Sequence, residues 1–248
     1  MPTPTTTIVL GPETVTVTVE NEQGMKSVKN TNMENVQQIF MREQSIETPL
    51  LPSQWGVVKY YRKNNFEGYV LTTPPTERKV SFDTGARGIP EEATIPVPPL
   101  LWVFEVRTSD DGSKSLTHSM MYALKHELLS FKDKVFHAPY PNIGVSHGIC
   151  WGDENPLVPT GKSIQNIPAR FFGQPFNSDL SSNRVASFES DILEERTDNA
   201  LYHMAQLARD LAQSKEAGEE YVYPFDSLKA SSMDVKDAIS AYLPRILS

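Results

Sequence analysis

The only cysteine of this sequence, Cys150, is its best candidate for covalent chemistry. It follows the stretch 136–149, "FHAPYPNIGVSHGI", which contains Asn142, His137 and His147. A nucleophilic cysteine needs solvent access and a stabilised thiolate, and a hydrogen-bond donor must face the oxyanion that forms when a thioester or amide carbonyl is attacked. The side-chain amide of Asn142 can be that donor, and either histidine can orient the loop or hold a proton. Together these residues could support nucleophilic acyl chemistry at Cys150.

Each of these residues also has a simpler interpretation. A single cysteine in a soluble protein is more often a small buried hydrophobe than a nucleophile. Asn142 could cap a turn, and Trp151, which follows the cysteine, could shield the thiol or anchor the core. Gly144 and Gly148 allow tight turns that would fold Asn142 back over the cysteine. The residues alone therefore leave a nucleophile and a structural thiol both open.

Composition narrows the class of protein and its surroundings. The chain has 248 residues, 39% hydrophobic and 22% charged, which is typical of a soluble globular protein. One cysteine excludes an intramolecular disulfide and fits the reducing cytoplasm. The net charge of −8 argues against nucleic acid as a partner. No apolar run reaches the roughly 18–20 residues of a membrane span, and the first residues lack the pattern of a signal peptide. We expect a cytoplasmic protein that binds neither nucleic acid nor membrane.

Motifs for metals and cofactors are absent from the sequence. It contains no HxxxH pattern, no Asp-rich segment and no Gly-rich phosphate loop, so we predict no metal and no nucleotide cofactor. His118 and His126 fall in or near an expected strand and are interpreted as structural or surface residues. The only histidine after Cys150, His203, falls on an expected amphipathic helix.

The elements that must position Cys150 are strands before it and helices after it. The irregular, Pro- and Gly-rich segment 127–161 carries the cysteine and separates the two groups. This order predicts an α+β protein, with an antiparallel meander of four or five strands, an active-site loop and C-terminal helices. Short Asn-, Asp-, Gly- and Pro-rich connectors separate the expected strands, which cover residues 55–63, 67–74, 78–84, 100–107 and 115–125, with an extended crossing segment at 88–99.

The two ends of the chain carry further elements. Alternating β-branched residues predict strands at 5–10 and 14–20 with a turn at Gly11-Pro12. Helices are expected within 32–44 and 187–214, and a last one is expected to be capped by Ser232 and stopped by Pro244. We therefore divide the chain into an N-terminal strand-rich extension (1–50), a core (51–215) and a C-terminal helical extension (216–248).

The cysteine segment resembles the catalytic segment of ubiquitin-conjugating enzymes. That segment follows a strand meander and reads His-Pro-Asn, then a loop with a glycine, then Gly-x-Ile-Cys or a close variant. Here "YPNIGVSHGIC" carries Pro141-Asn142 and Gly148-Ile149-Cys150, and the step of eight residues from the asparagine to the cysteine is the same.

Tyr140 departs from that pattern because it stands where the family has histidine, while His137 lies three residues earlier. This departure resembles a bacterial branch of the superfamily, prokaryotic family D, in which a "HAP..N" stretch precedes "CWG". The branch includes the plasmid-borne protein termed PRTRC system protein B. The strand "PPLLWVFEV" and the later "NIPARFFGQPFNSD" are also similar to that branch, so the resemblance covers about residues 50 to 215.

The resemblance implies a fold, a reaction and partners. The fold would be ubiquitin-conjugating-like, and Cys150 would accept a ubiquitin-like protein as a thioester and pass it to an amine. Asn142 would hold the oxyanion, and His137 would order the loop. The genes of this branch are found beside those for a ThiF-like adenylating enzyme, a ubiquitin-like protein and a JAB-type metallopeptidase, which are the partners we expect.

Two other functions compete with transfer. A protein of the same fold could bind a partner without chemistry. A cysteine hydrolase could use Cys150 with Asn142 and either His137 or His147. Papain-like hydrolases place the cysteine at the start of a helix with a histidine far downstream. The residues after Cys150, "WGDENP", make a poor helix start, which argues against hydrolysis.

Overall fold

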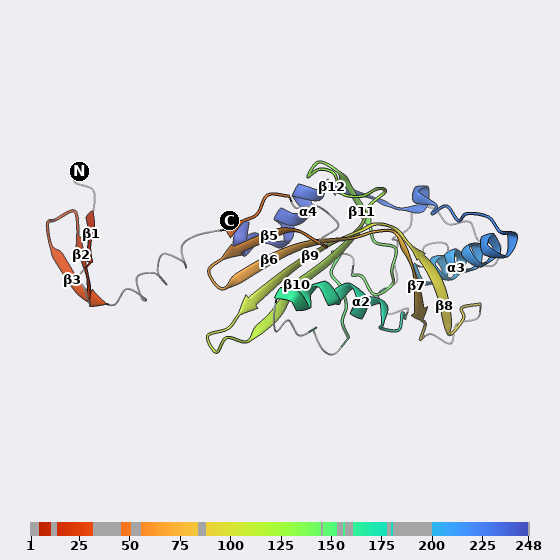
Figure 1. Cartoon of the computed structure of the whole chain (residues 1–248), viewed down its shortest axis with the longest axis horizontal. Coiled ribbons are helices and arrows are strands. Elements are labelled where there is room, and N and C mark those ends of the chain that lie inside the picture. Colours follow the sequence, from red (N-terminus) through yellow and green to blue (C-terminus); the bar gives the residue numbers. More distant parts are fainter. Residues whose placement is uncertain are drawn as a thin grey trace. The chain divides into compact units, whose positions relative to one another are not determined.

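The computed structural model divides into two compact units, Met1–Ile46 and Glu47–Ser248 (Figure 1). The expected separation of a C-terminal extension from a core stays a prediction. The structure describes residues 5–10, 14–31, 46–50, 56–83, 88–144, 146–152, 156, 161–177, 180 and 200–247.

The N-terminal unit contains an antiparallel three-stranded sheet of β1 (Thr5–Leu10), β2 (Val15–Glu20) and β3 (Lys26–Thr31). The first two strands confirm the sequence prediction, and β3 was not predicted. Its polar sequence, "KSVKNT", lacks the alternation of β2. The turn before it is specified locally, because Gly24 takes a positive φ of 77° and the side-chain oxygen of Asn21 accepts the backbone N–H of Met25. The turn predicted at Gly11-Pro12 and the helix predicted within 32–44 lie outside the described residues.

The larger unit is built on a sheet of seven strands in the order β12-β11-β10-β9-β6-β5-β4. Neighbours from β12 to β5 are antiparallel. The turn from β5 to β6 uses Asn64 at a φ of 54°, and the turn from β9 to β10 uses Gly112 at a φ of 81°. The strands are β4 (Ile46–Glu47), β5 (Val57–Lys63), β6 (Phe66–Thr73), β9 (Leu100–Thr108), β10 (Lys114–Ala123), β11 (Lys134–His137) and β12 (Ala230–Asp234).

The predicted single meander is wrong at its third strand. β7 (Thr76–Ser81) and β8 (Glu92–Val97) leave the main sheet and pair with each other, while β9 returns to pair with β6. Figure 1 shows this pair turning away from the end of the sheet. Proline pairs follow β6 and precede β9, and their missing N–H groups interrupt ladder pairing at those points. Strand β8 forms half of the segment expected as an extended crossing.

Helices follow the cysteine segment. The predicted long helix is present as α3 from Ala200 onward, and residues 187–199 lie outside the described part. The helix predicted to be the last is α4, and the short helix α5 follows it from Pro244. Helix α4 is capped by Asp234 rather than Ser232, because Asp234 and Asp237 form a capping box. The helices are η2 (Gly161–Asn166), α2 (Ile167–Phe172), α3 (Ala200–Ala217), η3 (Phe225–Ser227), α4 (Val235–Tyr242) and α5 (Pro244–Leu247).

The two faces of the main sheet bury separate cores. Along β9, Leu100, Trp102 and Phe104 pack on the face that also receives α2 and α3. Leu101 and Val103, which alternate with them, pack on the face that receives α4 and α5. This alternation follows from the two-residue period of a strand. The predicted α+β class, mostly antiparallel with a few helices, is confirmed.

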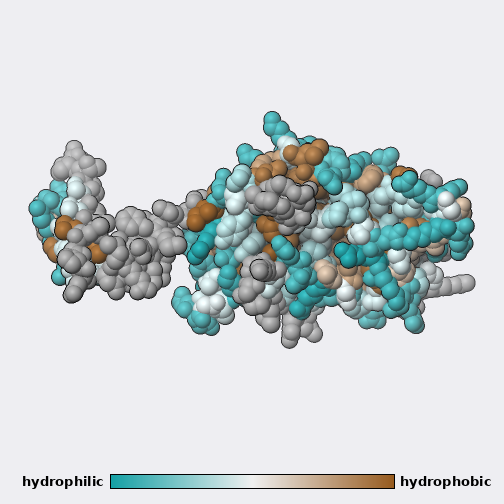
Figure 2. All heavy atoms as spheres, viewed as in Figure 1, coloured by the Kyte–Doolittle hydropathy of each residue, from teal (hydrophilic) through white to brown (hydrophobic). Residues whose placement is uncertain are grey.

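The surface is hydrophilic over most of the face shown in Figure 2, where apolar side chains gather only in small groups. Among the helices in the described ranges, none is both long and apolar enough to cross a membrane. Localisation in the cytoplasm stays a prediction.

Candidate functional site

The segment that carries Cys150 forms a small hairpin. The backbone N–H of Cys150 donates to the carbonyl of Asn142 at 2.9 Å, and the N–H of Gly144 donates to the carbonyl of Gly148 at 2.7 Å. Between them Ile143 pairs with Ile149 in an antiparallel bridge. The structure thus brings together the backbones of two candidate residues that lie eight positions apart in the sequence.

This hairpin continues the sheet beside β10. The N–H of Ile149 donates to the carbonyl of Ser119 at 2.9 Å, and the N–H of Met121 donates to the carbonyl of His147 at 3.1 Å. Strand β11 pairs with β10 only at residues 122 and 123. The cysteine segment therefore occupies the edge of β10 directly after β11 leaves it, and the rigid sheet fixes its position.

Buried neighbours hold Cys150 at the surface. The thiol residue is exposed, while Ile149 and Trp151 on either side are buried in the core. The indole Nε1 of Trp151 donates to Ser119 Oγ at 2.9 Å, and Gln174 Nε2 donates to the Trp151 carbonyl at 3.2 Å. Of the two interpretations left open for Trp151, the structure supports the core anchor. An exposed thiol between two fixed neighbours has the access that a nucleophile requires.

The side chain of Asn142 is buried and held by the segment after α2. Its Nδ2 donates to the carbonyl of Pro175 at 3.1 Å, and its Oδ1 accepts the backbone N–H of Asn177 at 3.4 Å. The bond to Pro175 uses one of the two N–H groups of the amide. The structure thus fixes the position of the amide next to the cysteine hairpin.

His147 is the point at which the hairpin turns. Its φ of 66° lies in the left-handed region, whereas Gly144 and Gly148 do not have positive φ angles. The tight turn expected at Gly144 and Gly148 is present and brings Asn142 back to Cys150, while its positive φ belongs to His147. The ring of His147 is buried between Tyr122, at 4.3 Å between centroids, and His137, at 4.4 Å. These two stacking contacts stabilise the strained conformation.

His137 belongs to β11, where its backbone N–H donates to the carbonyl of Lys229 at 2.9 Å. Its ring stacks on the ring of His147, which belongs to the cysteine hairpin. On the other side of this stack, the Tyr242 hydroxyl at the end of α4 donates to the carbonyl of Ser146 at 2.6 Å. The hairpin tip is therefore held from β10, β11 and α4.

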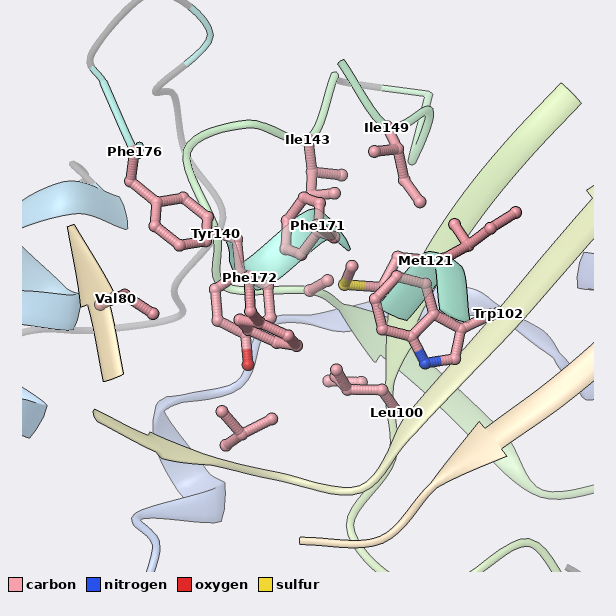
Figure 3. Close-up of a cluster of buried hydrophobic side chains, with 14 of the residues drawn as sticks. Val80, Leu100, Trp102, Met121, Tyr140, Ile143, Ile149, Phe171, Phe172 and Phe176 are labelled. Atoms are coloured by element: carbon pink, nitrogen blue, oxygen red, sulfur yellow. The ribbon is translucent and has the colours of Figure 1, made fainter. Parts of the chain in front are cut away.

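Tyr140, which stands in the place of the family histidine, is a core residue. Its ring packs at centroid distances of 5.4 to 6.0 Å against the aromatic cluster shown in Figure 3, which contains Phe171, Phe172 and Phe176. Burial raises the pKa of its hydroxyl well above the ordinary value. A hydroxyl that stays neutral inside an aromatic core anchors the loop and does not exchange protons near neutral pH.

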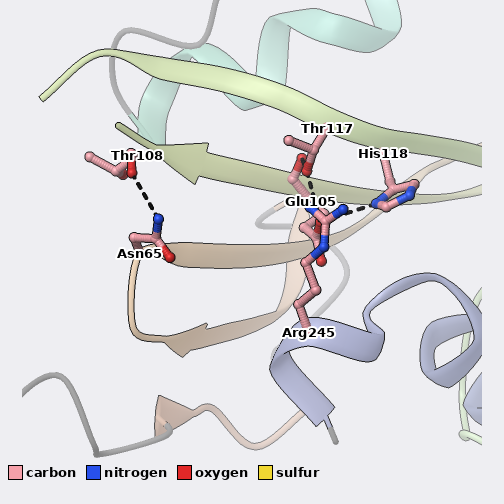
Figure 4. A network of polar contacts seen from close by, with 6 residues as sticks. All are labelled: Asn65, Glu105, Thr108, Thr117, His118 and Arg245. Atoms are coloured by element: carbon pink, nitrogen blue, oxygen red, sulfur yellow. Dashed lines mark hydrogen bonds and ion pairs between the residues drawn. The ribbon is translucent and has the colours of Figure 1, made fainter. Parts of the chain in front are cut away.

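A second polar cluster, which the sequence did not reveal, surrounds the carboxylate of Glu105 (Figure 4). Glu105 has no exposed side-chain surface. Its Oε1 accepts from Thr117 Oγ1 at 2.8 Å, from His118 Nδ1 at 3.0 Å and from Arg245 Nη1 at 3.2 Å. His118 is therefore a structural residue that bonds to a buried carboxylate. The register of β9 and β10 joins Glu105 to Thr117 and His118, and α5 adds Arg245, so no local sequence signal exists.

The remaining histidines are placed elsewhere. His126 is exposed, and its Nδ1 lies 2.8 Å from the carbonyl of Glu127. His203 is fully buried in α3 beside Ser227, and burial lowers its pKa from 6.5 to about 4. Within the described ranges, no three side chains of His, Cys, Asp or Glu gather in a way that would hold a metal ion.

The order of these elements, an antiparallel meander, a cysteine hairpin on its edge and helices after it, is that of an E2-like, or ubiquitin-conjugating-like, fold. The model of prokaryotic E2 family D matches residues 30–221. The chain belongs to this family and is an E2-like protein of a conjugation system. The match begins earlier than the resemblance seen in the sequence, which started near residue 50. No curated protein and no solved structure matches the chain.

Proposed function

We propose that this protein is a ubiquitin-conjugating-like transferase that accepts a ubiquitin-like protein as a thioester on Cys150 and passes it to an amine. The observation that carries the proposal is the exposed thiol of Cys150, held between buried Ile149 and Trp151 and bonded through its N–H to Asn142. Membership of prokaryotic E2 family D supports it independently.

The first step is thioester exchange. The Cys150 thiolate attacks the thioester carbonyl by which an activating enzyme carries the ubiquitin-like protein. A new C–S bond forms to Cys150, the old C–S bond breaks, and the cysteine of the activating enzyme leaves as a thiolate. Because one thioester replaces another, the step is close to balanced in free energy and needs little driving force. Its main requirement is access, which the exposed position of Cys150 supplies.

The second step is attack by an amine on the thioester of Cys150. The carbonyl oxygen gains negative charge as the tetrahedral intermediate forms, and a fixed N–H donor lowers the barrier. Asn142 is the residue we assign to that donor, because its amide is already held beside the hairpin by Pro175 and Asn177. His137 positions the hairpin through its stack with His147 rather than touching the reacting atoms.

We further propose the partners that the family resemblance implies. These are a ubiquitin-like protein, a ThiF-like adenylating enzyme that activates it, and a JAB-type metallopeptidase from the same gene neighbourhood. Within the family, we propose a relationship to the plasmid-borne PRTRC system protein B. The "HAP..N" and "CWG" elements of the sequence, at residues 137–142 and 150–152, support this assignment.

Thioester formation tests the proposal. The full chain is incubated with the adenylating enzyme and ubiquitin-like protein of its gene neighbourhood and ATP, then analysed by non-reducing electrophoresis and intact mass spectrometry. We expect an adduct that thiols release and that Cys150→Ala abolishes. A second variant combines Cys150→Ala with Ser146→Cys, which moves the only thiol to another exposed position of the same hairpin. This variant should form no thioester with the ubiquitin-like protein.

The non-catalytic binding module is the alternative outcome. It predicts that the activating enzyme forms its own thioester with the ubiquitin-like protein while no adduct forms on Cys150. It also predicts that the ubiquitin-like protein binds the wild type and Cys150→Ala with equal affinity. That pair of results would overturn transfer and leave Cys150 as an ordinary exposed thiol.

A further inference from the structure

The edge of β10 runs alongside the cysteine segment. Met120 pairs with Gly148 in an antiparallel bridge, and Ile149 bonds to Ser119, where the pairing ends. Extended by two residues beyond the bridge, from 120 to 118 and from 148 to 150, the same register would set His118 across from Cys150. Residues directly opposite in antiparallel strands project from the same face, with Cβ atoms about 4.5–5.5 Å apart.

The burial pattern supports this register beyond the bridge. Ile149 and Trp151 project into the core on one face, and the Trp151 indole bonds to the Ser119 side chain. Cys150 lies between them and therefore projects to the other face. That face also carries Met120 and the helices α4 and α5. His118, which is two residues before Met120 on β10, belongs to the same face.

The imidazole of His118 is already oriented for proton transfer. Its Nδ1 faces Glu105 Oε1 at 3.0 Å, and a carboxylate can only accept, so Nδ1 carries the proton and Nε2 is left as the basic nitrogen. Thr117, on the same strand as His118, and Arg245 of α5 also bond to the carboxylate and fix it. The His118 side chain is 34% exposed, so a substrate can reach it. This is the arrangement in which a buried carboxylate orients a catalytic imidazole.

We propose that His118 is the general base of the amine-transfer step and that Glu105 is its positioning residue. The inference rests on the proposed function of Cys150. As the amine adds to the thioester carbonyl, a C–N bond forms and the ammonium proton moves to His118 Nε2. The C–S bond then breaks, and the proton passes from His118 to the departing Cys150 thiolate. The products are an isopeptide bond and the free thiol, so atoms and protons balance.

The test measures two steps separately: formation of the Cys150 thioester, called charging, and its transfer to an amine, called discharge. The Cys150 thioester is prepared, and its single-turnover discharge to free lysine is measured from pH 6 to pH 9. We expect His118→Gln to be charged within about twofold of the wild type, while general-base loss slows its discharge by about 10²–10⁴-fold. Among the described residues, Glu105 pairs with His118, and Arg245 pairs with the same carboxylate. The pH profile of discharge should differ between the wild type and His118→Gln, because the variant lacks the proton acceptor.

Three further measurements distinguish a chemical role of His118 from an effect of its substitution on folding. Added imidazole should partly restore discharge in His118→Ala, which a folding defect would not allow. Glu105→Gln should slow discharge and alter its pH profile without abolishing charging. The exposed control His126→Gln should behave like the wild type. Normal charging with an unchanged discharge profile in His118→Gln would overturn this inference alone. Failure of the wild type to become charged would overturn the proposed function and this inference with it.

A separate observation identifies a second site, between β5 and α4. Lys59 projects into a cavity of about 330 Å³, and only 8% of its side chain is exposed. Its ammonium lies 5.1 Å from the ring centre of Tyr61 and 5.2 Å from that of Phe131. The nearest carboxylate oxygen, Glu47 Oε2, is 3.6 Å away, beyond hydrogen-bond distance. Lys59 has no hydrogen bond from its ammonium to any side chain of the described residues.

The walls of this cavity define the ligand that would fit. Lys236 and Ser240 of α4 add a second cation and a hydroxyl, and apolar side chains form the rest of the wall together with the two rings. A buried ammonium whose contacts within the described residues are two aromatic rings and one exposed carboxylate favours an anion, and the apolar wall favours a short hydrocarbon tail. Glu47 is 63% exposed and shows that the ammonium accepts a carboxylate. We infer that the cavity binds a small carboxylate with an apolar tail, which displaces Glu47.

Hexanoate is the probe, with 1-hexanol and hexylammonium as controls of matched length. Backbone NMR of the full chain should show saturable shifts at Lys59, Tyr61 and Ser240 with hexanoate. Lys59→Met, which keeps the apolar stem, should weaken binding at least tenfold, and Glu47→Gln should strengthen it severalfold. Lys79→Met, at an exposed ion pair, should have no effect. The absence of saturable shifts, equal binding to Lys59→Met, or equal binding of hexanol would each overturn the site.

Discussion

Cys150 and Asn142 are joined by a direct hydrogen bond, from the backbone N–H of the cysteine to the carbonyl of the asparagine at 2.9 Å. Asn142 is in turn bonded through its side chain to Pro175 and Asn177. The thiol therefore cannot move far from the asparagine without breaking the hairpin and its connection to the segment after α2. This fixed relationship is what a nucleophile and an oxyanion donor require.

Removing the amide of Asn142 should affect discharge more than charging. We expect Asn142→Ala to slow transfer of the ubiquitin-like protein to lysine by about 10²–10³-fold, because one oxyanion donor is lost. The same variant should lose about 1–3 kcal/mol of unfolding free energy, since the N–H of Asn177 and the carbonyl of Pro175 lose their partner. Single-turnover discharge and urea denaturation measure the two effects. Discharge at the wild-type rate in a folded variant would remove Asn142 from the mechanism.

Tyr242 should control the rigidity of the hairpin from α4. Tyr242→Phe removes the hydroxyl that donates to the Ser146 carbonyl and keeps the ring. We expect a loss of about 1 kcal/mol and faster hydrogen exchange at the His147 amide, which bonds to the Gly144 carbonyl across the tip. Tyr60→Phe, in β5, is a matched control and should leave exchange at His147 unchanged. Equal protection of His147 in both variants would show that α4 does not hold the tip.

The sequence predicted the parts of the fold that depend on periodicity. Strand β2 alternates β-branched residues, β9 is a long apolar run, and the long face of α3 follows the helical period. The missed elements are short or lie in irregular composition. Strand β11 has four residues inside a Pro- and Gly-rich segment, and α2 has six residues with Pro168 at its start. Such elements form because tertiary contacts hold them, which local propensity does not record.

The residues of the candidate site also fall into those that the sequence reveals and those that it does not. Cys150 and Asn142 stand out because their residue types and spacing are visible in one segment. The pair of Glu105 and His118 is thirteen residues apart, and a β-bulge at residue 117 sets which side chains share a face. A one-residue shift in register would separate them, so the pairing of β9 with β10 has to be known before the contact can be inferred.

The hydroxyl of Tyr140 should contribute nothing to stability. It is buried and has no hydrogen-bond partner within the described part of the chain, while the ring packs against several phenylalanines. We expect Tyr140→Phe to change the free energy of unfolding by less than about 1 kcal/mol or to raise it. Tyr140→His should lower it by about 1–3 kcal/mol, because a polar ring then enters an aromatic core. Chemical denaturation of both variants checks this. Greater loss with phenylalanine than with histidine would assign the hydroxyl an essential role.

The Glu105 network should couple α5 to the sheet. Arg245→Met removes an ion pair to a fully buried carboxylate and a cation–π contact with Phe66. Because the Arg245 side chain is about half exposed, solvent screens the pair, and we expect a coupling of about 1 kcal/mol. A double-mutant cycle with Glu105→Gln, followed by urea denaturation, isolates this term. Additive effects of the two substitutions would show that Arg245 acts through Phe66 alone.

The buried His203 should make stability fall in mild acid. Burial lowers its pKa from 6.5 to about 4, so between these values the unfolded chain binds a proton that the folded protein excludes. The unfolded state is then favoured, and the stabilisation present above pH 6.5 is lost as the pH falls toward 4.

From pH 7 to pH 5 this histidine should account for about 2 kcal/mol of lost unfolding free energy. Urea denaturation at both values, in the wild type and in His203→Gln, measures its share, because other titrating groups are common to both proteins. Glutamine keeps a polar group that can reach Ser227 and cannot be protonated in this range. The difference between the two pH values should therefore shrink by about that amount in the variant, while the exposed control His126→Gln keeps the wild-type dependence. An equal loss in wild type and His203→Gln would mean that His203 takes up its proton in the folded protein as readily as in the unfolded chain.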